Sequence, residues 1–362
     1  MSTEIEIKSP HAPALKRLTA ELSDLANFCD QDDQWPARQL ALCAKHGVFK
    51  WFVPKHYGGN GWDDQEIVKG YIKLAAACLT TTFVITQRTG ACKRILESEN
   101  VSLAKRLLPG LVSGAAFTTL GISHLTTSSR HLSKPILVAK ETDKGWLLNG
   151  MSPWVTGAHA ADHIVIGSEV ESGEQILLAV AGDLPGLTVG QPNDLVALSG
   201  SKTGQVSFDQ VMIPHEFVLA GPKENVLKQG KRQSTGGLQT SALAIGLASA
   251  AVDFVKREAS KPNRSDLVST AAALESQYNG LLDRILALAG GDPVCTNEEL
   301  RTDANSFALR AAQAALVTAK GTGFVAGHSV GRWCREALFF LVWSCPQVVR
   351  DANLCELAGI LD

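Results

Sequence analysis

The spacing of hydrophobic residues in the first third of the chain is typical of amphipathic helices. One apolar stripe consists of four leucines: Leu15, Leu18, Leu22 and Leu25. A second stripe runs from Leu40 to Val48, where Gly47 supplies a residue type that commonly ends a helix. The proline and the glycines of residues 53–62 then predict a loop. We therefore predict an N-terminal α-helical domain over residues 1–114.

Short runs of alternating apolar and polar residues replace this spacing between residues 115 and 222. Two predicted hairpins, residues 136–148 and 163–181, each place a glycine-containing turn between two alternating runs. Residues 205–213 alternate in the same way and stop at Pro214. Because no helical segment separates these strands, the pattern predicts a middle antiparallel β domain, built as a small barrel or sandwich.

Helical spacing returns in the last third of the chain. Apolar stripes at residues 243–254, 274–288 and 304–315 predict three helices, and residues 290–293 break the chain between the second and the third. The third stripe is rich in alanine, and small side chains let helix backbones approach closely. We predict a C-terminal α-helical bundle domain over residues 223–362. The fold class is therefore α+β.

Composition and charge exclude several classes of function. The chain has 362 residues, with 34 Lys and Arg against 36 Asp and Glu, and a net charge of −2. This balance gives no basic surface for nucleic acid. The apolar runs are shorter than the roughly 20 residues of a spanning helix, so we expect no membrane insertion. The N-terminus has no signal pattern and the eight cysteines form no Cys-x-x-Cys pair, which favours a cytoplasmic protein with reduced thiols.

Two histidines, His159 and His163, have the spacing with which a helix binds a metal ion. The residues around them predict strand and turn rather than helix, and no helical Glu accompanies them. We therefore expect no metal site.

Five motifs follow one another along the chain, at residues 54–61, 145–156, 160–165, 206–214 and 350–352. They read Pro-x-x-Tyr-Gly-Gly-x-Gly, Gly-Trp-x-x-Asn-Gly-x-x-x-Trp-x-Thr, Ala-Ala-Asp-His-Ile-Val, Val-x-Phe-x-x-Val-x-Ile-Pro and Arg-Asp-Ala. In their order and in the helix–strand–helix layout, the chain resembles the acyl-CoA dehydrogenase superfamily. The resemblance implies a flavoprotein oxidoreductase that binds FAD and acts on CH–CH groups of an acyl thioester, bound to CoA or to a carrier. It also implies a homodimer or homotetramer.

The resemblance assigns cofactor contacts residue by residue. Trp154 matches the family's tryptophan that packs on the isoalloxazine, and Thr156 matches the threonine that bonds its redox edge. Other implied contacts are three hydroxyls for the flavin or its phosphates and one guanidinium, from Thr118, Thr119, Ser129 and Arg264. The alternative interpretation is structural: Trp154 is then a core aromatic, Thr156 a strand residue, and the hydroxyls belong to turns or bulges.

The chain also departs from the family pattern. Counted from Arg350, the family's catalytic Glu falls near Gly359, where this chain has no acid, and Glu356 is the nearest candidate base. Glu356 can equally be a solvated or capping residue. The glycine pair before the last active-site turn is replaced by Phe339-Phe340 or Trp343-Ser344. Glycines there permit close approach of the backbone to a phosphate, and bulky aromatics do not.

Three hypotheses follow from these matches and departures. The first is an acyl-CoA dehydrogenase-like oxidoreductase that uses FAD. The second is a flavin-dependent monooxygenase or oxidase of the same fold, which needs no base for an α-proton. The third is a catalytically inactive relative that serves as a binding or assembly protein.

Overall fold

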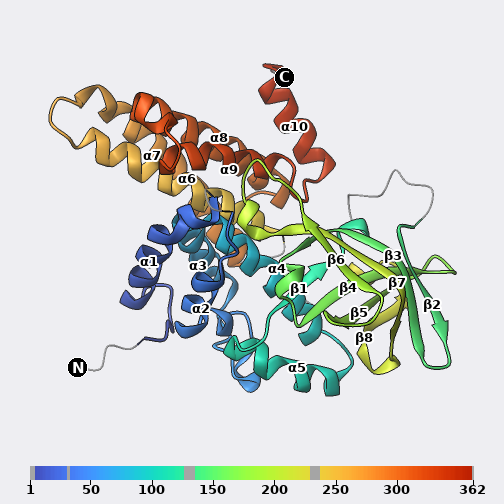
Figure 1. Ribbon diagram of the computed structural model, residues 1–362. Helices are drawn as coiled ribbons and strands as arrows, with labels where there is room; N and C mark the ends of the chain where they lie inside the picture. Colours follow the sequence, from blue (N-terminus) through green and yellow to red (C-terminus); the bar gives the residue numbers. More distant parts are fainter. Residues whose placement is uncertain (1–4, 31–32, 126–134, 229–236, 361–362) are drawn as a thin grey trace.

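The computed structural model describes residues 5–30, 33–125, 135–228 and 237–360. Along the chain, helices precede and follow the strands, as the hydrophobic pattern predicts. In space, the N-terminal and C-terminal helices lie together beside the sheet (Figure 1). The N-terminal helices are α1 (Pro13–Asp30), α2 (Ala37–Lys45), α3 (Asp64–Ala77), α4 (Leu79–Leu96) and α5 (Val101–Ser113). The C-terminal helices are α6 (Leu238–Ala259), α7 (Val268–Ala289), α8 (Asn297–Ala319), α9 (Ser329–Leu338) and α10 (Gln347–Leu357). The predicted break at residues 290–293 separates α7 from α8.

The middle of the chain forms one sheet, in the order β6-β7-β3-β2-β4-β5-β8, with β1 paired to β4. Its strands are β1 (Thr118–Gly121), β2 (Leu137–Thr142), β3 (Gly145–Thr156), β4 (His163–Val170), β5 (Gln175–Ala181), β6 (Leu187–Pro192), β7 (Thr203–Ile213) and β8 (Val218–Lys223). Both predicted hairpins are confirmed, as β2–β3 and β4–β5.

The sheet is mixed, which corrects the prediction of a purely antiparallel domain. Strands β1 and β2 each run parallel to β4. A parallel pair needs a connection longer than a hairpin loop, and here β3 itself forms part of the connection between β2 and β4. The prediction considered only runs that are neighbours in sequence, and it therefore found only the antiparallel pairs.

The central strands β4 and β5 are buried on both faces. Ile164 and Leu178 belong to a core that consists mainly of strand residues. Val165 and Leu177, one position along each strand, belong to a second core shared with α4 and α5. Because neighbouring residues on a strand point to opposite faces, this alternation fixes the register of the sheet against those helices.

Helix α6 joins the two helical regions into one core. It is buried along most of its length and packs on both α3 and α8. A Cβ at Gly246 would lie 2.6 Å from the carbonyl oxygen of Ile72, so only glycine allows α6 to approach α3 this closely. By length and composition α6 could cross a membrane, but 72% of its apolar window is buried inside the protein, as in a core helix.

A buried network of charged and polar side chains connects α9 to α1. The Arg332 guanidinium donates to Asn27, and its Nε lies 3.7 Å from an oxygen of Glu336. Nearby, Arg335 donates to the carboxylate of Asp30 at 2.6 Å. Glu336 is only 2% exposed, and this burial raises the pKa of its carboxyl group to about 8.

Helix α10 extends away from the other helices (Figure 1). It packs on α8 through Val349 and Asn353, which are the buried residues of this helix. Its other faces and the short segment that follows it expose four aliphatic side chains: Val348, Leu354, Leu357 and Ile360.

The raised pKa of Glu336 makes a prediction about stability. In the unfolded chain this carboxyl group titrates near 4.5, so the folded state holds a proton that the unfolded state releases between about pH 5 and pH 8. The stability of the wild type should therefore fall relative to a Glu336→Gln variant as pH rises through this window, by up to about 1.4 kcal/mol per pH unit. Urea unfolding at pH 5, 6.5 and 8 measures the difference.

Glu141→Gln, at an exposed position of β2, is the matched control and should show no such trend. A stability difference between wild type and Glu336→Gln that is constant, or that grows in favour of the wild type with rising pH, would contradict the prediction.

Candidate active site

The end of strand β3 carries the two residues that the sequence assigns to a flavin ring. Trp154 is 47% exposed, whereas Thr156, two residues on, is 3% exposed. The pairing of β3 with β7 shifts register between Ser152 and Val155, so the regular alternation of faces is interrupted here. The indole is thus an open aromatic surface, and the structure does not support its interpretation as a core residue.

Residue Gly157 anchors this strand end to the N-terminal helices. It adopts a φ of +64°, and a Cβ there would lie 2.3 Å from the ring of Trp35, which precedes α2. The Trp35 ring meets Phe117 and His159 edge-on, at centroid distances of 5.4 and 5.0 Å. The site therefore lies at the junction between the sheet and the helical domain.

Three buried hydroxyls form a chain behind the strand end. The Thr156 hydroxyl lies 2.9 Å from that of Thr203, which lies 2.8 Å from that of Ser201. Thr119 donates to the carbonyl oxygen of Thr156 at 2.7 Å. A hydroxyl both donates and accepts, so this chain satisfies its own members and fixes the backbone that presents Trp154.

Two of the other predicted hydroxyls, those of Thr118 and Thr119, form hydrogen bonds within the sheet. Thr118 and Thr119 are fully buried, and each donates to a backbone carbonyl oxygen, of His163 and Thr156 respectively. Their role in the described structure is to hold β1 against β4 and β3. Ser129 lies outside the described residues.

Arg264 is held at the end of α6, with its partners on α6 and α8. It donates to a carboxylate oxygen of Glu258 at 3.2 Å and to the carbonyl oxygen of Thr318 at 3.2 Å. These contacts tie the turn after α6 to the C-terminal end of α8. The contacts of Arg264 within the described chain therefore do not bring it to Trp154.

Glu356 is on α10 and faces α8. Its carboxylate accepts a hydrogen bond from the Ser306 hydroxyl and lies 4.0 Å from the Arg310 guanidinium. Its side chain is 49% exposed. The carboxylate is therefore engaged on the outer side of the helix bundle, and none of these contacts involves β3.

A cavity of about 400 Å³ lies beside the strand end and was not predicted from the sequence. His159, Gln191 and Lys202 provide its polar lining. Of the residues at the strand end, Val155 lines the cavity, and Trp154 and Thr156 do not. Burial and the neighbouring Lys202 lower the pKa of His159, which favours a neutral imidazole that can donate and accept hydrogen bonds. His159 is the one polar residue of this cavity that we singled out from the sequence, and only as a possible metal ligand. Among the described residues no cluster of three metal-binding side chains occurs.

Comparison with known proteins gives a consistent result. A family model for the N-terminal domain of acyl-CoA dehydrogenases matches residues 14–115. A probable acyl-CoA dehydrogenase of Bacillus subtilis is 25% identical over 64% of this chain, which spans 63% of that relative's length. Cyclohex-1-ene-1-carbonyl-CoA dehydrogenase of Geobacter metallireducens is 23% identical over 88% of this chain and 89% of its own length.

The fold agrees over nearly the whole chain. A glutaryl-CoA dehydrogenase of Mycobacterium smegmatis, solved in complex with FADH2, superposes with a TM-score of 0.80 at 15% identity, and the match covers 97% of this chain and 96% of that one. The chain therefore carries an N-terminal domain of the acyl-CoA dehydrogenase type and has the acyl-CoA dehydrogenase fold over nearly its whole length.

The residues that stand in place of the expected glycine pair lie between α9 and α10. The rings of Phe339 and Trp343 stack at 5.0 Å, and Phe83 of α4 meets both edge-on at 4.9 and 5.1 Å. Arg301 of α8 donates to the carbonyl oxygens of Trp343 and Ser344 and fixes the turn. The residues that replace the glycine pair therefore form a packed aromatic cluster. In this turn no glycine backbone is available for the close approach of a phosphate.

Proposed function

We propose that this protein is a flavoprotein oxidoreductase that binds FAD and acts on an acyl thioester, carried by CoA or by a carrier protein. The observation that carries the proposal is the open indole of Trp154, at the strand end where the ordered family motifs expect the isoalloxazine. Membership of the superfamily, and the FADH2 held by the Mycobacterium smegmatis enzyme, support it. The scattered cysteines, which form no Cys-x-x-Cys pair, support a cytoplasmic location.

The described residues fit one end of the cofactor and not the other. Trp154 offers an aromatic face, and the hydroxyl chain of Thr156, Thr203 and Ser201 holds the strand that presents it. The phosphate end has no comparable residues: Arg264 is already paired, and aromatic rings fill the turn before α10. We therefore infer that the adenine and phosphates depend on a second copy of the chain or on residues outside the described ones.

In the proposed reaction the cofactor accepts electrons, and the protein residues bind and position the cofactor. FAD, when bound, supplies a two-electron acceptor for a hydride from the acyl chain. Trp154 would bind the ring system through its indole, since aromatic faces stack in an offset arrangement. Thr156 acts as a positioning residue, because its buried hydroxyl reaches Thr203 rather than solvent. Both residues bind or orient, and neither moves a proton.

One observation favours the second candidate, a flavin-dependent monooxygenase or oxidase. Abstraction of an α-proton needs a carboxylate or another base within hydrogen-bond reach of the substrate. Glu356, the candidate from the sequence, is engaged by Ser306 and Arg310 on α8. Oxygen activation at a reduced flavin needs no such base, so this placement is compatible with it.

Flavin binding tests the proposal directly. We expect the purified protein to show flavin absorbance, or to quench FAD fluorescence saturably on titration. Trp154→Ala should weaken FAD binding by about fivefold, because one aromatic contact contributes on the order of 1 kcal/mol. Phe324→Ala, which removes an exposed aromatic side chain from the C-terminal region, is the control and should leave binding unchanged. Colourless protein that takes up no FAD would instead support the inactive relative.

The role of Glu356 separates the two enzymatic candidates. We expect Glu356→Gln to change kcat with a panel of straight-chain acyl-CoA substrates by less than about threefold, because its carboxylate is bound on α8. Loss of a general base would instead lower kcat by roughly 10²–10⁴-fold. Asp351→Asn, also on α10 and exposed, is the control. Hydrogen peroxide release, measured in parallel, distinguishes an oxidase from a dehydrogenase.

We also propose that the protein is a homo-oligomer, a dimer or a tetramer, and that α10 forms part of the contact. The four exposed aliphatic side chains on and after this helix support this, because apolar patches of this kind commonly mark interfaces. The double substitution Leu354→Glu and Leu357→Glu should lower the mass measured by light scattering. Val196→Glu, at an exposed apolar residue between β6 and β7, should not. A wild-type monomer would contradict the proposal.

A further inference from the structure

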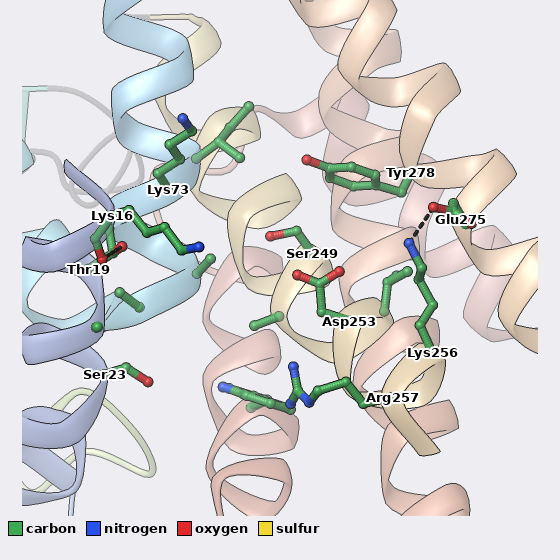
Figure 2. A pocket seen from close by; sticks show the side chains of 17 residues that line it. Lys16, Thr19, Ser23, Lys73, Ser249, Asp253, Lys256, Arg257, Glu275 and Tyr278 are labelled. Carbon is green, nitrogen blue, oxygen red and sulfur yellow. Dashed lines mark hydrogen bonds and ion pairs between the residues drawn. The ribbon is translucent and has the colours of Figure 1, made fainter. Parts of the chain in front are cut away.

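A second cavity, of about 530 Å³, lies between the N-terminal and the C-terminal helices (Figure 2). Helices α1 and α3 form one wall, α6 and α7 form the other, and α9 contributes Trp333. No residue of the sheet lines it, so the cavity is separate from the strand end that carries Trp154. Its volume is within the range of roughly 300–1,000 Å³ that small-molecule sites occupy.

Two lysines give the first wall a positive charge. Figure 2 shows the Lys16 side chain of α1 extending across the cavity toward Ser249, with Lys73 of α3 above it. The Lys73 ammonium donates to the carbonyl oxygen of Pro10 at 2.6 Å, which holds it in place. In the part of the chain that the structure describes, neither lysine forms an ion pair with a carboxylate. Two uncompensated cations in one concave site attract an anion.

The opposite wall carries a carboxylate and a phenol. Asp253 of α6 faces the cavity and, unlike the neighbouring Lys256–Glu275 pair, makes no ion pair among the described residues (Figure 2). The Tyr278 hydroxyl of α7 also points into the cavity (Figure 2). A carboxylate repels a simple anion, so a ligand that binds here has to present hydrogen-bond donors to Asp253 and its negative charge to the lysines.

The rest of the lining is mixed: Thr19, Ser23 and Ser249 add hydroxyl groups, Arg257 adds a further positive charge, and small apolar side chains complete it. Three alanines, Ala76, Ala77 and Ala250, leave room between the helices, and the ring of Tyr278 adds an aromatic surface. A ligand that fills this space therefore combines a charged group, hydroxyl groups and a flat or apolar part.

We propose that this cavity binds a nucleoside phosphate. Its phosphate would lie between Lys16 and Lys73, because ammonium groups bind phosphate oxygens strongly. The ribose hydroxyls would donate to Asp253, as ribose hydroxyls do to a carboxylate in dinucleotide sites. The base would pack on the Tyr278 ring and the alanines. The same chemical group occurs in a free nucleotide and in the nucleotide end of coenzyme A.

Calorimetric titration of the full chain with AMP tests the proposal. We expect saturable binding that weakens as salt rises, and at least tenfold weaker binding in the Lys16→Ala and Lys73→Ala variants. Lys105→Ala, which removes an exposed lysine from α5, is the matched control and should bind like the wild type. Asp253→Asn should weaken AMP but leave inorganic phosphate unchanged or tighter, because it removes the acceptor for the ribose and a repulsive charge.

A protection experiment needs no variant. AMP should slow the acetylation of Lys16 and Lys73 in the wild type, measured by mass spectrometry, and leave Lys105 unaffected. Coenzyme A that competes with AMP and binds more tightly would identify its nucleotide end as the source, and weaker binding would identify a free nucleotide. Absence of saturable AMP binding, equal loss in Lys105→Ala, or unprotected Lys16 would overturn the proposal. None of these results depends on FAD or on turnover.

Discussion

The close approach of α6 to α3 is the constraint on which the rest of the structure depends. At Gly246 the two backbones are so near that any side chain would collide with the carbonyl oxygen of Ile72. This contact places helices from the two ends of the chain in a single apolar core that includes α1, α3, α6 and α8. The sheet is consequently an insertion between two halves of one helical body. Its position is determined by α4 and α5, on which one of its faces packs.

This arrangement explains where the candidate site lies. The strand end with Trp154 leaves the sheet at the side where Trp35 covers Gly157, so the indole is held at the boundary of the two cores. Buried hydroxyls at Thr119, Thr156 and Thr203 satisfy one another and the backbone. Such a satisfied polar group stiffens its surroundings without offering a free partner to a ligand. Rigid support and ligand contact are thus divided between the threonines and the tryptophan.

Local patterns in the sequence predicted the local structure well. Apolar spacing located α1, α2, α6, α7 and α8, and glycine turns located both hairpins, because each depends on residues that are neighbours in the chain. The parallel pairs of β4 were missed, since they depend on strands that are distant in sequence. The same limit applies to the sites. The family motifs led to Trp154. No pattern in the sequence indicated that the hydroxyls of Thr118 and Thr119 would donate hydrogen bonds to backbone carbonyl oxygens.

Sites built from several helices were the least predictable from sequence. The cavity that holds Lys16, Lys73 and Asp253 draws on five helices, and its charges have no common motif. Arg264 and Glu356 show a second limit: a residue that matches a family motif in the sequence does not thereby have a known interaction partner in the structure. Arg264 donates to Glu258 at the end of α6, and Glu356 accepts a hydrogen bond from Ser306 on α8.

The engagement of Glu356 also restricts the chemistry of the first site. A general base has to exchange its existing contacts for contact with the substrate. Here Glu356 accepts a hydrogen bond from the Ser306 hydroxyl and lies 4.0 Å from the Arg310 guanidinium, and both groups are on α8. For α-proton abstraction, α10 would have to shift as a unit, since Asn353 of this helix is bonded to Asn305 of α8. Chemistry at Trp154 that proceeds without this carboxylate requires no such rearrangement.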